Sequence, residues 1–370
     1  MDSALVPFTR NLCEAVTGFS DFIFKRNELR QYPEVIALAF WFRAANLKHI
    51  RKRLTDDESP KTIHRVFHIA PANVDTVFVY SLLLSVLSGN YNIVRISERS
   101  GEITWLLVDI FKQYLNTQQG KLLQALVCIV EYPAKHQTVT EQLSNWCDLR
   151  VVWGGDDAIR AISAIAPHTQ QVSFPNRYSL AVINANEQTD LALLSRAFLT
   201  DVLPFNQQAC SSPKAIYWLN TERDVQDRFW KIVLSQLPTI NHNLSVSNKV
   251  EQHINFQYLA ASQGLKMAGK SQSKNGSFAR VVSVGALGHC KVSEITPAIL
   301  EAHSGNGLII EQDIRNINDI ACSTTLQTVS YFGFDDKITL EGVHKRMVPL
   351  GKSLNFDVVW DGIDLLQAFN

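Results

Sequence analysis

Residues 65–96 read RVFHIA-PANVDTVFVY-SLLLSVLSGN-YNIVRI. The apolar runs at 65–70 and 92–96 have the length of buried strands, and the run at 76–87 has the length of a buried helix. The turn residues Ser88-Gly89-Asn90 separate this helix from the second strand. A strand, a helix and a strand in this order are typical of a parallel pair with a crossover connection. The stretch therefore predicts the beginning of a doubly wound sheet.

The same alternation of strands and helices continues to residue 166. Further strands are predicted at 126–130 and 150–153, and further helices at 103–115, 138–146 and 157–166. This pattern favours an α/β fold with a Rossmann-type parallel-sheet cofactor domain. A second alternating region begins at Tyr178 and predicts a second α/β domain. Its strands are expected at 180–183, 215–219, 279–284 and 307–310, and its helices at 191–202 and 224–237.

The chain of 370 residues is long enough for two domains with separate cores. Residues 33–54 are predicted as one amphipathic helix that ends in the basic run 48–53. This run is either a solvated helix end or a contact for a phosphate-bearing substrate. The polar stretch 246–277 contains an expected exposed loop at 270–277. We predict a helical arm at 1–60, a dinucleotide-binding domain at 61–178, a catalytic domain at 179–345, and a C-terminal tail at 346–370 with a role in oligomerisation.

Composition excludes several classes of function. The chain has 35 Lys and Arg residues and 35 Asp and Glu residues, so no net field favours nucleic acid or a membrane surface. The longest apolar run, 74–87, is too short for a transmembrane segment, and residues 1–16 lack the apolar core of a signal peptide. The six cysteines form no CxxC or Cys/His cluster. We therefore expect reduced thiols, no metal site and a cytoplasmic location.

Cys210 lies in the stretch NQQACSSP at residues 206–213, directly after an apolar helical pattern. Small polar neighbours and a following proline place the thiol where the chain turns out of a helix. Such a position is partly accessible and near main-chain N–H groups, which suits a reactive thiolate. The alternative is a small buried hydrophobe, the commoner role of an unpaired cysteine.

Two other motifs follow predicted strands. Gly154 and Gly155 lie between a strand and a helix, where glycine lets the main chain approach a phosphate group. A plain tight turn is the alternative. Asn73 follows the first strand, and its amide could donate a hydrogen bond to an oxyanion or cap the next helix.

Arg95, Ser97 and Glu98 lie at the end of the second predicted strand. A cation, a hydroxyl and a carboxylate at the carboxyl edge of a parallel sheet are placed to bind an adenosine ribose or its 2′-phosphate. Ordinary polarity at a strand end explains the pattern equally well. The three side chains remain candidates for cofactor binding.

In this order, these elements resemble the aldehyde dehydrogenase superfamily. The similarity is greatest to one branch, the NADPH-dependent acyl-CoA reductases typified by the fatty acid reductase of bacterial luminescence (LuxC-like). Four segments are similar to this branch in particular, namely 152–156, 206–213, 326–329 and 348–353 together with 360–365. The likeness extends from about Tyr32 to the end of the chain, and the luminescence enzymes are somewhat longer.

The resemblance assigns a role to each motif. It implies that Cys210 is the acylated nucleophile and that Asn73 is the oxyanion-hole amide. It also implies that Gly154 and Gly155 form the phosphate turn, and that Arg95, Ser97 and Glu98 form the ribose-binding stretch. Arg95 stands where many relatives have lysine. The resemblance implies NADPH as the cofactor. Because Glu98 would repel a 2′-phosphate, NADH is not excluded.

One departure from the superfamily indicates the reaction. Members that produce carboxylic acids have a glutamate, a few dozen residues before the cysteine, that activates the hydrolytic water. Here no acidic residue occurs between Asp157 and Glu187. Without that base, attack of water on an acyl-enzyme is slow, which favours reduction of a thioester. The alternatives are a CoA-acylating or ordinary aldehyde dehydrogenase, or a catalytically silent binding member.

The expected reaction is reduction of acyl-CoA, or another acyl thioester, to an aldehyde through an acyl group on Cys210. His168 and His303 are candidates for the group that lowers the pKa of the thiol. A homo-oligomer is expected, as is a complex with an acyl-activating or acyl-transfer enzyme. The acyl chain length and the pathway stay open.

Overall fold

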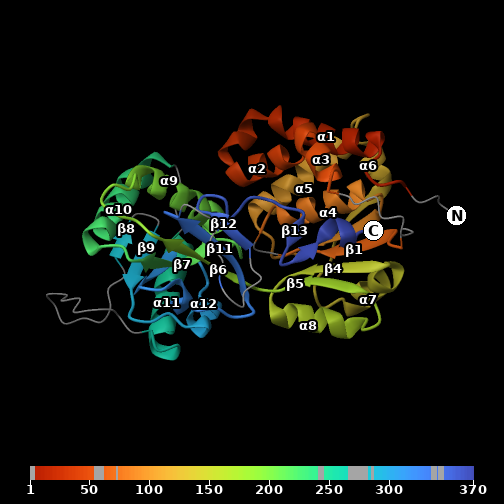
Figure 1. Cartoon of the computed structure of the whole chain (residues 1–370). Coiled ribbons are helices and arrows are strands. Elements are labelled where there is room, and N and C mark those ends of the chain that lie inside the picture. Colours follow the sequence, from red (N-terminus) through yellow and green to blue (C-terminus); the bar gives the residue numbers. More distant parts are fainter. Residues whose placement is uncertain are drawn as a thin grey trace. The chain divides into compact units, whose positions relative to one another are not determined.

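The computed structural model describes residues 5–53, 62–71, 74–240, 246–265, 282–284, 287–334, 340 and 346–370. The chain forms two compact units, each built around a mostly parallel sheet (Figure 1). The first unit contains Met1–Asn176 and Phe356–Asn370, and the second contains Arg177–Asn355. Residues 346–355 of the predicted tail thus belong to the second unit and the remainder to the first. No helix of the described residues is long and apolar enough to span a bilayer.

The sheet of the first unit has five parallel strands, and its central strand is the first in sequence. In spatial order these are β3 (Val127–Glu131), β2 (Tyr91–Ile96), β1 (Arg65–Ile69), β4 (Leu149–Trp153) and β5 (Gln171–Phe174). The chain winds outward from β1 in both directions, which confirms the predicted doubly wound sheet. The strand order reverses between β1 and β4, the point where ligands of such sheets bind.

Helices cover both faces of this sheet (Figure 1). On one face lie α4 (Val77–Leu87) and α5 (Glu102–Leu115), and on the other lie α7 (Gln137–Trp146) and α8 (Asp156–Ile165). Neighbouring residues of β1 therefore both lie in apolar cores: Val66 on the side of α4 and Phe67 on the side of α7 and α8. Every residue of α4 is buried, as the apolar run predicted.

The N-terminal arm consists of α1 (Arg10–Phe24), α2 (Pro33–Trp41) and α3 (Ala44–Arg51), with α6 (Lys121–Leu126) beside α1. The prediction of a single helix at 33–54 was wrong, because the chain leaves the helix at Phe42 and is extended at Arg43. The break places the Phe42 ring in the core, while the Arg43 guanidinium lies over the ring of Phe40. No glycine or proline marks this break in the sequence.

The sheet of the second unit has seven strands, parallel except for the terminal pair. In spatial order these are β12 (Arg346–Pro349), β11 (Leu326–Phe332), β6 (Tyr178–Ile183), β7 (Pro213–Leu219), β10 (Leu308–Ile314), β9 (Leu287–Lys291) and β8 (Val282–Val284). One face packs against α9 (Leu191–Val202) and α10 (Arg223–Gln236), and the other against α11 (Val246–Ser262) and α12 (Pro297–Ala302). The second α/β domain is thus confirmed.

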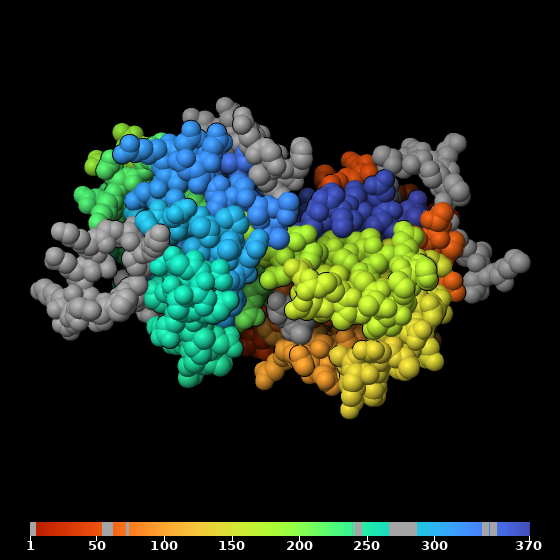
Figure 2. Space-filling view, turned by 90° about the horizontal axis from the view of Figure 1, so that it is seen from below, coloured from red at the N-terminus to blue at the C-terminus, as the bar shows by residue number. Residues whose placement is uncertain are grey.

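Helix α11 was not predicted, because some of its polar residues are buried while some of its apolar residues are exposed, which obscures the apolar pattern of a helix. Its buried residues include Gln252 and Asn255, whereas Val250 and Ile254 are exposed on the outer surface, where α11 appears in teal in Figure 2. The predicted strand at 279–284 is described only at 282–284, and the predicted loop at 270–277 lies outside the described residues.

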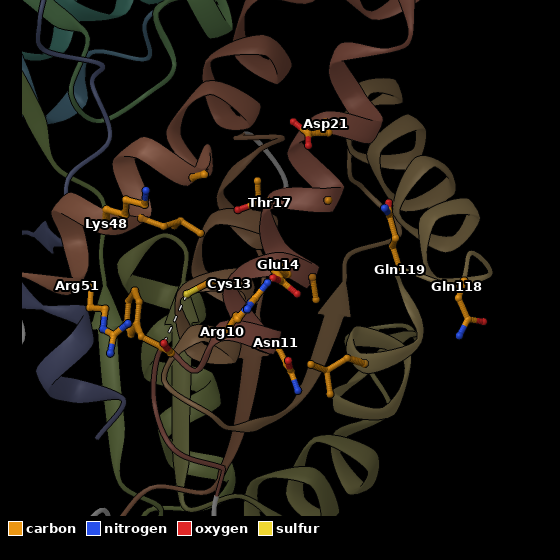
Figure 3. A pocket seen from close by; sticks show the side chains of 16 residues that line it. Arg10, Asn11, Cys13, Glu14, Thr17, Asp21, Lys48, Arg51, Gln118 and Gln119 are labelled. Carbon is orange, nitrogen blue, oxygen red and sulfur yellow. Dashed lines mark hydrogen bonds and ion pairs between the residues drawn. The ribbon is translucent and has the colours of Figure 1, made fainter.

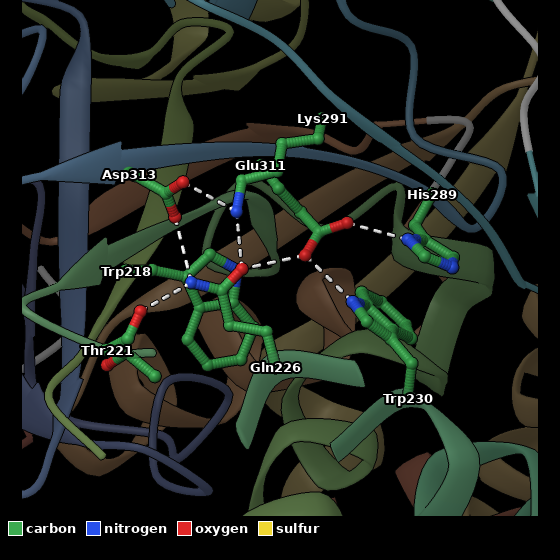
Figure 4. A network of polar contacts seen from close by, with 8 residues as sticks. All are labelled: Trp218, Thr221, Gln226, Trp230, His289, Lys291, Glu311 and Asp313. Carbon is green, nitrogen blue, oxygen red and sulfur yellow. Dashed lines mark hydrogen bonds and ion pairs between the residues drawn. The ribbon is translucent and has the colours of Figure 1, made fainter. Parts of the chain in front are cut away.

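A buried carboxylate links three strands and a helix of the second unit (Figure 4). Glu311 on β10 accepts hydrogen bonds from the indole N–H groups of Trp218, at 2.8 Å, and Trp230, at 2.7 Å. His289 on β9 lies 2.6 Å from the second carboxylate oxygen and stacks on the Trp230 ring. Because unpaired buried carboxylates are costly, these partners are what allow Glu311 to sit in the core.

The tail residues that return to the first unit form a short hairpin, β13 (Val359–Trp360) and β14 (Ile363–Asp364), and a turn of helix, α13 (Leu365–Ala368). The Trp360 ring packs edge-on against Trp153, which itself stacks on Phe174. Two of the segments that resemble the reductases, 152–156 and 360–365, are therefore in contact.

Candidate functional site

Cys210 lies in a loop with an unusual backbone. The loop leaves α9 through the single turn η2 (Pro204–Gln207), in which Phe205, Asn206 and Gln207 have φ values of 55°, 52° and 63°. A left-handed conformation costs a residue with a side chain about 1–2 kcal/mol. Three in succession persist only where the surroundings impose them, and such segments occur mostly at functional sites.

The fully buried side chain of Gln207 holds this loop in place. Its amide nitrogen donates to the main-chain oxygens of Pro213, at 2.7 Å, and Leu308, at 2.8 Å, which are the first residues of β7 and β10. The loop before β10 approaches closely: a Cβ atom on Gly305 would lie 2.5 Å from the Gln207 main-chain oxygen. Glycine is therefore required at position 305, where φ is also +86°.

The main chain on both sides of the thiol is attached to the neighbouring strands. Cys210 is half-buried. Its main-chain oxygen accepts a hydrogen bond of 2.7 Å from the Ser179 hydroxyl, which accepts in turn from the Thr328 N–H at 3.1 Å. The Ser211 hydroxyl donates to the Gln327 side-chain oxygen at 3.1 Å. Segment 326–329, which resembles the reductases, thus contacts the cysteine loop.

Segment 348–353 is attached to the helix that precedes the loop. Asp201, in the last turn of α9, accepts hydrogen bonds from the N–H groups of Gly351, at 2.7 Å, and Ser353, at 3.0 Å. Burial raises the pKa of Asp201 to about 6, against these hydrogen bonds, which lower it. Three of the reductase-like segments therefore meet around one helix and one loop of the second unit.

Two buried basic groups lie near this loop. Lys214, on β7, is 6% exposed, and its ammonium donates to the main-chain oxygen of Leu300 at 3.3 Å. Burial lowers its pKa to about 8, with Cys210 and Glu301 acting in the opposite direction. Burial, and then the nearby charge of Lys214, lowers the pKa of His303 to about 3.

The lowered pKa of His303 argues against its role as a cation beside the thiol. His303 is neutral at physiological pH, and its Nδ1 accepts a hydrogen bond from the Gly305 N–H at 3.0 Å. It therefore holds the loop before β10 and supplies no cation. His168 is exposed in the first unit, between α8 and β5. The sequence reasoning missed Lys214, whose only signal is a charged residue at the start of an apolar strand.

In the first unit, Gly154 and Gly155 follow β4 at the carboxyl edge of the sheet, and Gly155 is the N-cap of α8. Neither glycine has a positive φ. A Cβ atom on Gly155 would meet no described atom within 4 Å, and one on Gly154 would make an ordinary contact of 3.6 Å with Ala158. The described part of the fold therefore does not itself require glycine at either position.

The other predicted cofactor residues lie on the same edge, at the end of β2. The Arg95 guanidinium donates to the Tyr132 main-chain oxygen, at 3.1 and 3.3 Å, and lies over the Tyr132 ring. The Ser97 hydroxyl accepts from the Arg99 N–H at 3.2 Å, and Glu98 is exposed. Asn73 lies outside the described residues.

A cavity of about 880 Å³ lies elsewhere in the first unit, between α1, α3 and the turn before α6 (Figure 3). Lys48 and Arg51 of the basic run line it, together with the exposed ion pair Arg10–Glu14. The sulfur of Cys13 faces the main-chain oxygen of Phe8. Of the predicted catalytic and cofactor residues that the structure describes, none lines this cavity.

Residues 49–370 match the profile of a family described as acyl-CoA reductase (LuxC). The long-chain acyl-protein thioester reductase of Vibrio harveyi is 22% identical over 315 residues, covering 79% of this chain and 63% of that protein. The enzyme of that name from Aliivibrio fischeri is 26% identical over 176 residues, covering 45% and 36%. The chain spans less than two thirds of the length of these relatives.

Solved structures share the fold at low identity. An NAD-dependent aldehyde dehydrogenase from Sinorhizobium meliloti superposes with a TM-score of 0.65 at 12% identity, covering 93% of this chain and 75% of that chain. PnpE from Pseudomonas sp. WBC-3 superposes with a TM-score of 0.65 at 14% identity, covering 92% and 77%. The predicted aldehyde dehydrogenase-like fold is therefore confirmed.

Proposed function

Because the chain belongs to the acyl-CoA reductase (LuxC) family, we propose that it reduces an acyl thioester to an aldehyde through an acyl group carried by Cys210. The observation that supports this most is the loop around Cys210. Its strained backbone is held by hydrogen bonds of the Gln207 side chain and the Ser179 hydroxyl, and Gly305 lets a neighbouring loop approach it closely. A cysteine that only filled space would not need its main chain fixed in this way.

In the first proposed step, the Cys210 thiolate attacks the carbonyl carbon of the acyl thioester. A new carbon–sulfur bond forms at Cys210, and the donor leaves as its own thiolate. The donor is acyl-CoA or a protein-bound acyl group, because relatives carry the name of acyl-protein thioester reductases. Fixing the main-chain oxygen of Cys210 on Ser179 keeps the thiol in one orientation during attack.

The acyl group must then survive until it is reduced. The superfamily position for a hydrolytic glutamate falls in the acid-free stretch between Asp157 and Glu187. Without a carboxylate to take a proton from water, hydrolysis of the thioester is slow. This supports reduction as the proposed outcome, in preference to release of a carboxylic acid.

The proposed cofactor is a nicotinamide dinucleotide, NADPH in preference to NADH. When bound, it supplies the hydride that reduces the acyl carbon. The groups proposed to hold it are the main chain of Gly154 and Gly155 and the side chains of Arg95, Ser97 and Glu98. Two glycines that the described fold does not need, at the N-terminus of a helix and beside the topological switch point, support this assignment. The resemblance alone supports Asn73 as donor to the oxyanion.

The proposal is tested by intact-mass spectrometry. Wild type, Cys210→Ala and Cys128→Ala are incubated with medium- and long-chain acyl-CoA, and then with NADPH or NADH. We expect an acyl adduct on wild type and on the Cys128→Ala control, whose mutated thiol is exposed in the first unit. The adduct should be absent from Cys210→Ala and should be released as aldehyde by one cofactor. An adduct that persists on Cys210→Ala, or no adduct with any chain length or acyl-protein donor, would refute the proposal.

A further inference from the structure

The placement of Lys214 calls for an explanation. It is the second residue of β7, a strand whose seven residues are all buried. Its ammonium, 6% exposed, donates to the neutral main-chain oxygen of Leu300 on α12. A buried ammonium is costly unless a negative charge compensates it, because a carbonyl dipole replaces only part of its hydration.

The pKa of Lys214 shows that the charge persists. Burial lowers this pKa to about 8, so the ammonium is still the main form at pH 7. Of the described groups whose charges act on it, His303 is neutral, since its own pKa falls to about 3. Glu301 is exposed, and its carboxylate accepts hydrogen bonds from the hydroxyls of Ser323 and Thr325, at 3.3 and 2.6 Å. Solvent and these hydrogen bonds weaken its field at Lys214.

The third group is the thiol of Cys210, four residues before Lys214 and separated from it by the turn into β7. The loop that carries this thiol is anchored to the same strand, because Gln207 donates to the Pro213 main-chain oxygen. The main chain that carries the thiol is therefore fixed relative to β7, Cys210 is itself partly buried, and a negative charge on it acts on the Lys214 ammonium.

We infer that Lys214 is the electrostatic partner of Cys210 and maintains it as a thiolate before the acyl donor binds. This inference rests on the proposed function, since it names the group that prepares the proposed nucleophile. The interaction is reciprocal: a thiolate that stabilises the ammonium is stabilised by it to the same extent. Ionisation of the thiol and loss of the ammonium proton are therefore coupled, and the two groups titrate as a pair.

The test measures ionisation of Cys210 without acyl donor or cofactor. The rate of alkylation by iodoacetamide is followed by peptide mass spectrometry from pH 5.5 to 9.5 in the full chain. Wild type is compared with Lys214→Met, which removes the charge at similar length, and with Lys214→Arg, which retains it. The exposed thiol of Cys128 is the reference within each sample.

We expect wild-type Cys210 to be alkylated with an apparent pKa at least one unit below that of Cys128. Lys214→Met should lower its alkylation rate at pH 6.5 by about tenfold or more, which corresponds to one unit of pKa. Lys214→Arg should keep most of the wild-type profile. Equal profiles for Cys210 in wild type and Lys214→Met would overturn the inference.

Folding of the variants does not limit the test. If Lys214→Met is not folded by circular dichroism, Lys214→Gln replaces it, and the wild-type comparison of Cys210 with Cys128 stands by itself. A wild-type Cys210 that titrates together with Cys128 also refutes the inference. An early-ionising Cys210 that forms no acyl adduct would instead count against the proposed function, so the two failures are distinguishable.

Discussion

The Ser179 hydroxyl donates a hydrogen bond of 2.7 Å to the main-chain oxygen of Cys210, although 31 residues separate them in the sequence. Ser179 is the second residue of β6, and its oxygen also accepts from the Thr328 N–H on β11. One small side chain therefore connects the loop that carries the thiol to the two strands beside it. The contact fixes the main chain from which the thiol projects.

Replacement of Ser179 by alanine should reduce acylation of Cys210 by about tenfold, a loss equivalent to about 1.4 kcal/mol of positioning. Stability should fall by about 1–3 kcal/mol, because the buried Thr328 N–H loses its acceptor. The rate of adduct formation and urea unfolding measure the two effects. Ser330→Ala is the matched control, since the hydroxyl of this buried serine on β11 donates a long hydrogen bond of 3.4 Å to the main-chain oxygen of Leu180. An acylation rate unchanged in Ser179→Ala would show that the contact does not position the thiol.

Gly305→Ala should destabilise the second unit by about 2–4 kcal/mol, because a Cβ clash adds to the cost of a positive φ. The added carbon would lie 2.5 Å from the Gln207 main-chain oxygen and would displace the loop before Cys210. Gly362→Ala is the control: its φ is also positive, at +79°, but no described atom lies within 4 Å of the added carbon. We expect it to cost only about 1–2 kcal/mol. Equal losses of unfolding free energy would refute the steric explanation.

The carboxyl of Asp201 should make stability depend on pH in an unusual direction. Burial raises its pKa in the folded protein to about 6, above the usual 3.8, so the folded state binds the proton more tightly. The stabilisation from this group is complete below pH 4 and is lost as the pH rises to about 6. Its upper bound is about 3 kcal/mol, at about 1.4 kcal/mol for each unit of pKa.

Asp201→Asn removes this titration. The difference in unfolding free energy between wild type and variant should decrease between pH 4.5 and 6 and stay constant above pH 7. Urea unfolding at a series of pH values measures it. Parallel pH profiles for the two proteins would mean that the Asp201 carboxyl is ionised throughout, held in that form by the N–H groups of Gly351 and Ser353.

Gly155→Ser should weaken dinucleotide binding by about tenfold or more while changing stability by less than about 0.5 kcal/mol, since serine is also a good N-cap. No described atom lies within 4 Å of the added Cβ, so the unit itself has room for it. Fluorescence titration with NADPH and NADH gives the affinities. Acyl transfer to Cys210 needs no dinucleotide and should be retained, which controls for misfolding. Unchanged affinity would place the cofactor away from this turn.

Glu311→Gln should destabilise the second unit by about 2–4 kcal/mol. In wild type both carboxylate oxygens face ring N–H groups, and in the variant the amide N–H group would replace one of these acceptors and face a donor. Since Trp218 and Trp230 are among these donors, tryptophan fluorescence reports the local change during urea unfolding. Asp313→Asn is the matched control on the same strand, where the side chain is 58% exposed and a smaller effect is expected. Equal effects of the two substitutions would show that burial of the network adds nothing.

Local patterns in the sequence were sufficient for most of the fold. The prediction for α9 has the observed bounds, and α4 begins one residue after its predicted start. In these segments the apolar period agrees with burial in the tertiary structure. The apolar period does not agree with burial in α11, where Gln252 is buried and Ile254 is exposed. It also fails at Phe42, where the helix ends and the ring is buried in the core.

The sequence by itself determined which residue types stand at each turn: a cysteine after a helix, two glycines after a strand, and a stretch without acids. The roles assigned to Cys210, Asn73 and the cofactor residues stay predictions. Only the tertiary structure decided that the distant Ser179 holds the main chain of Cys210, that the Lys214 ammonium is buried against Leu300, and that burial keeps His303 neutral. The physical reason is that burial and hydrogen bonding depend on contacts between strands far apart in the chain, which no local pattern records.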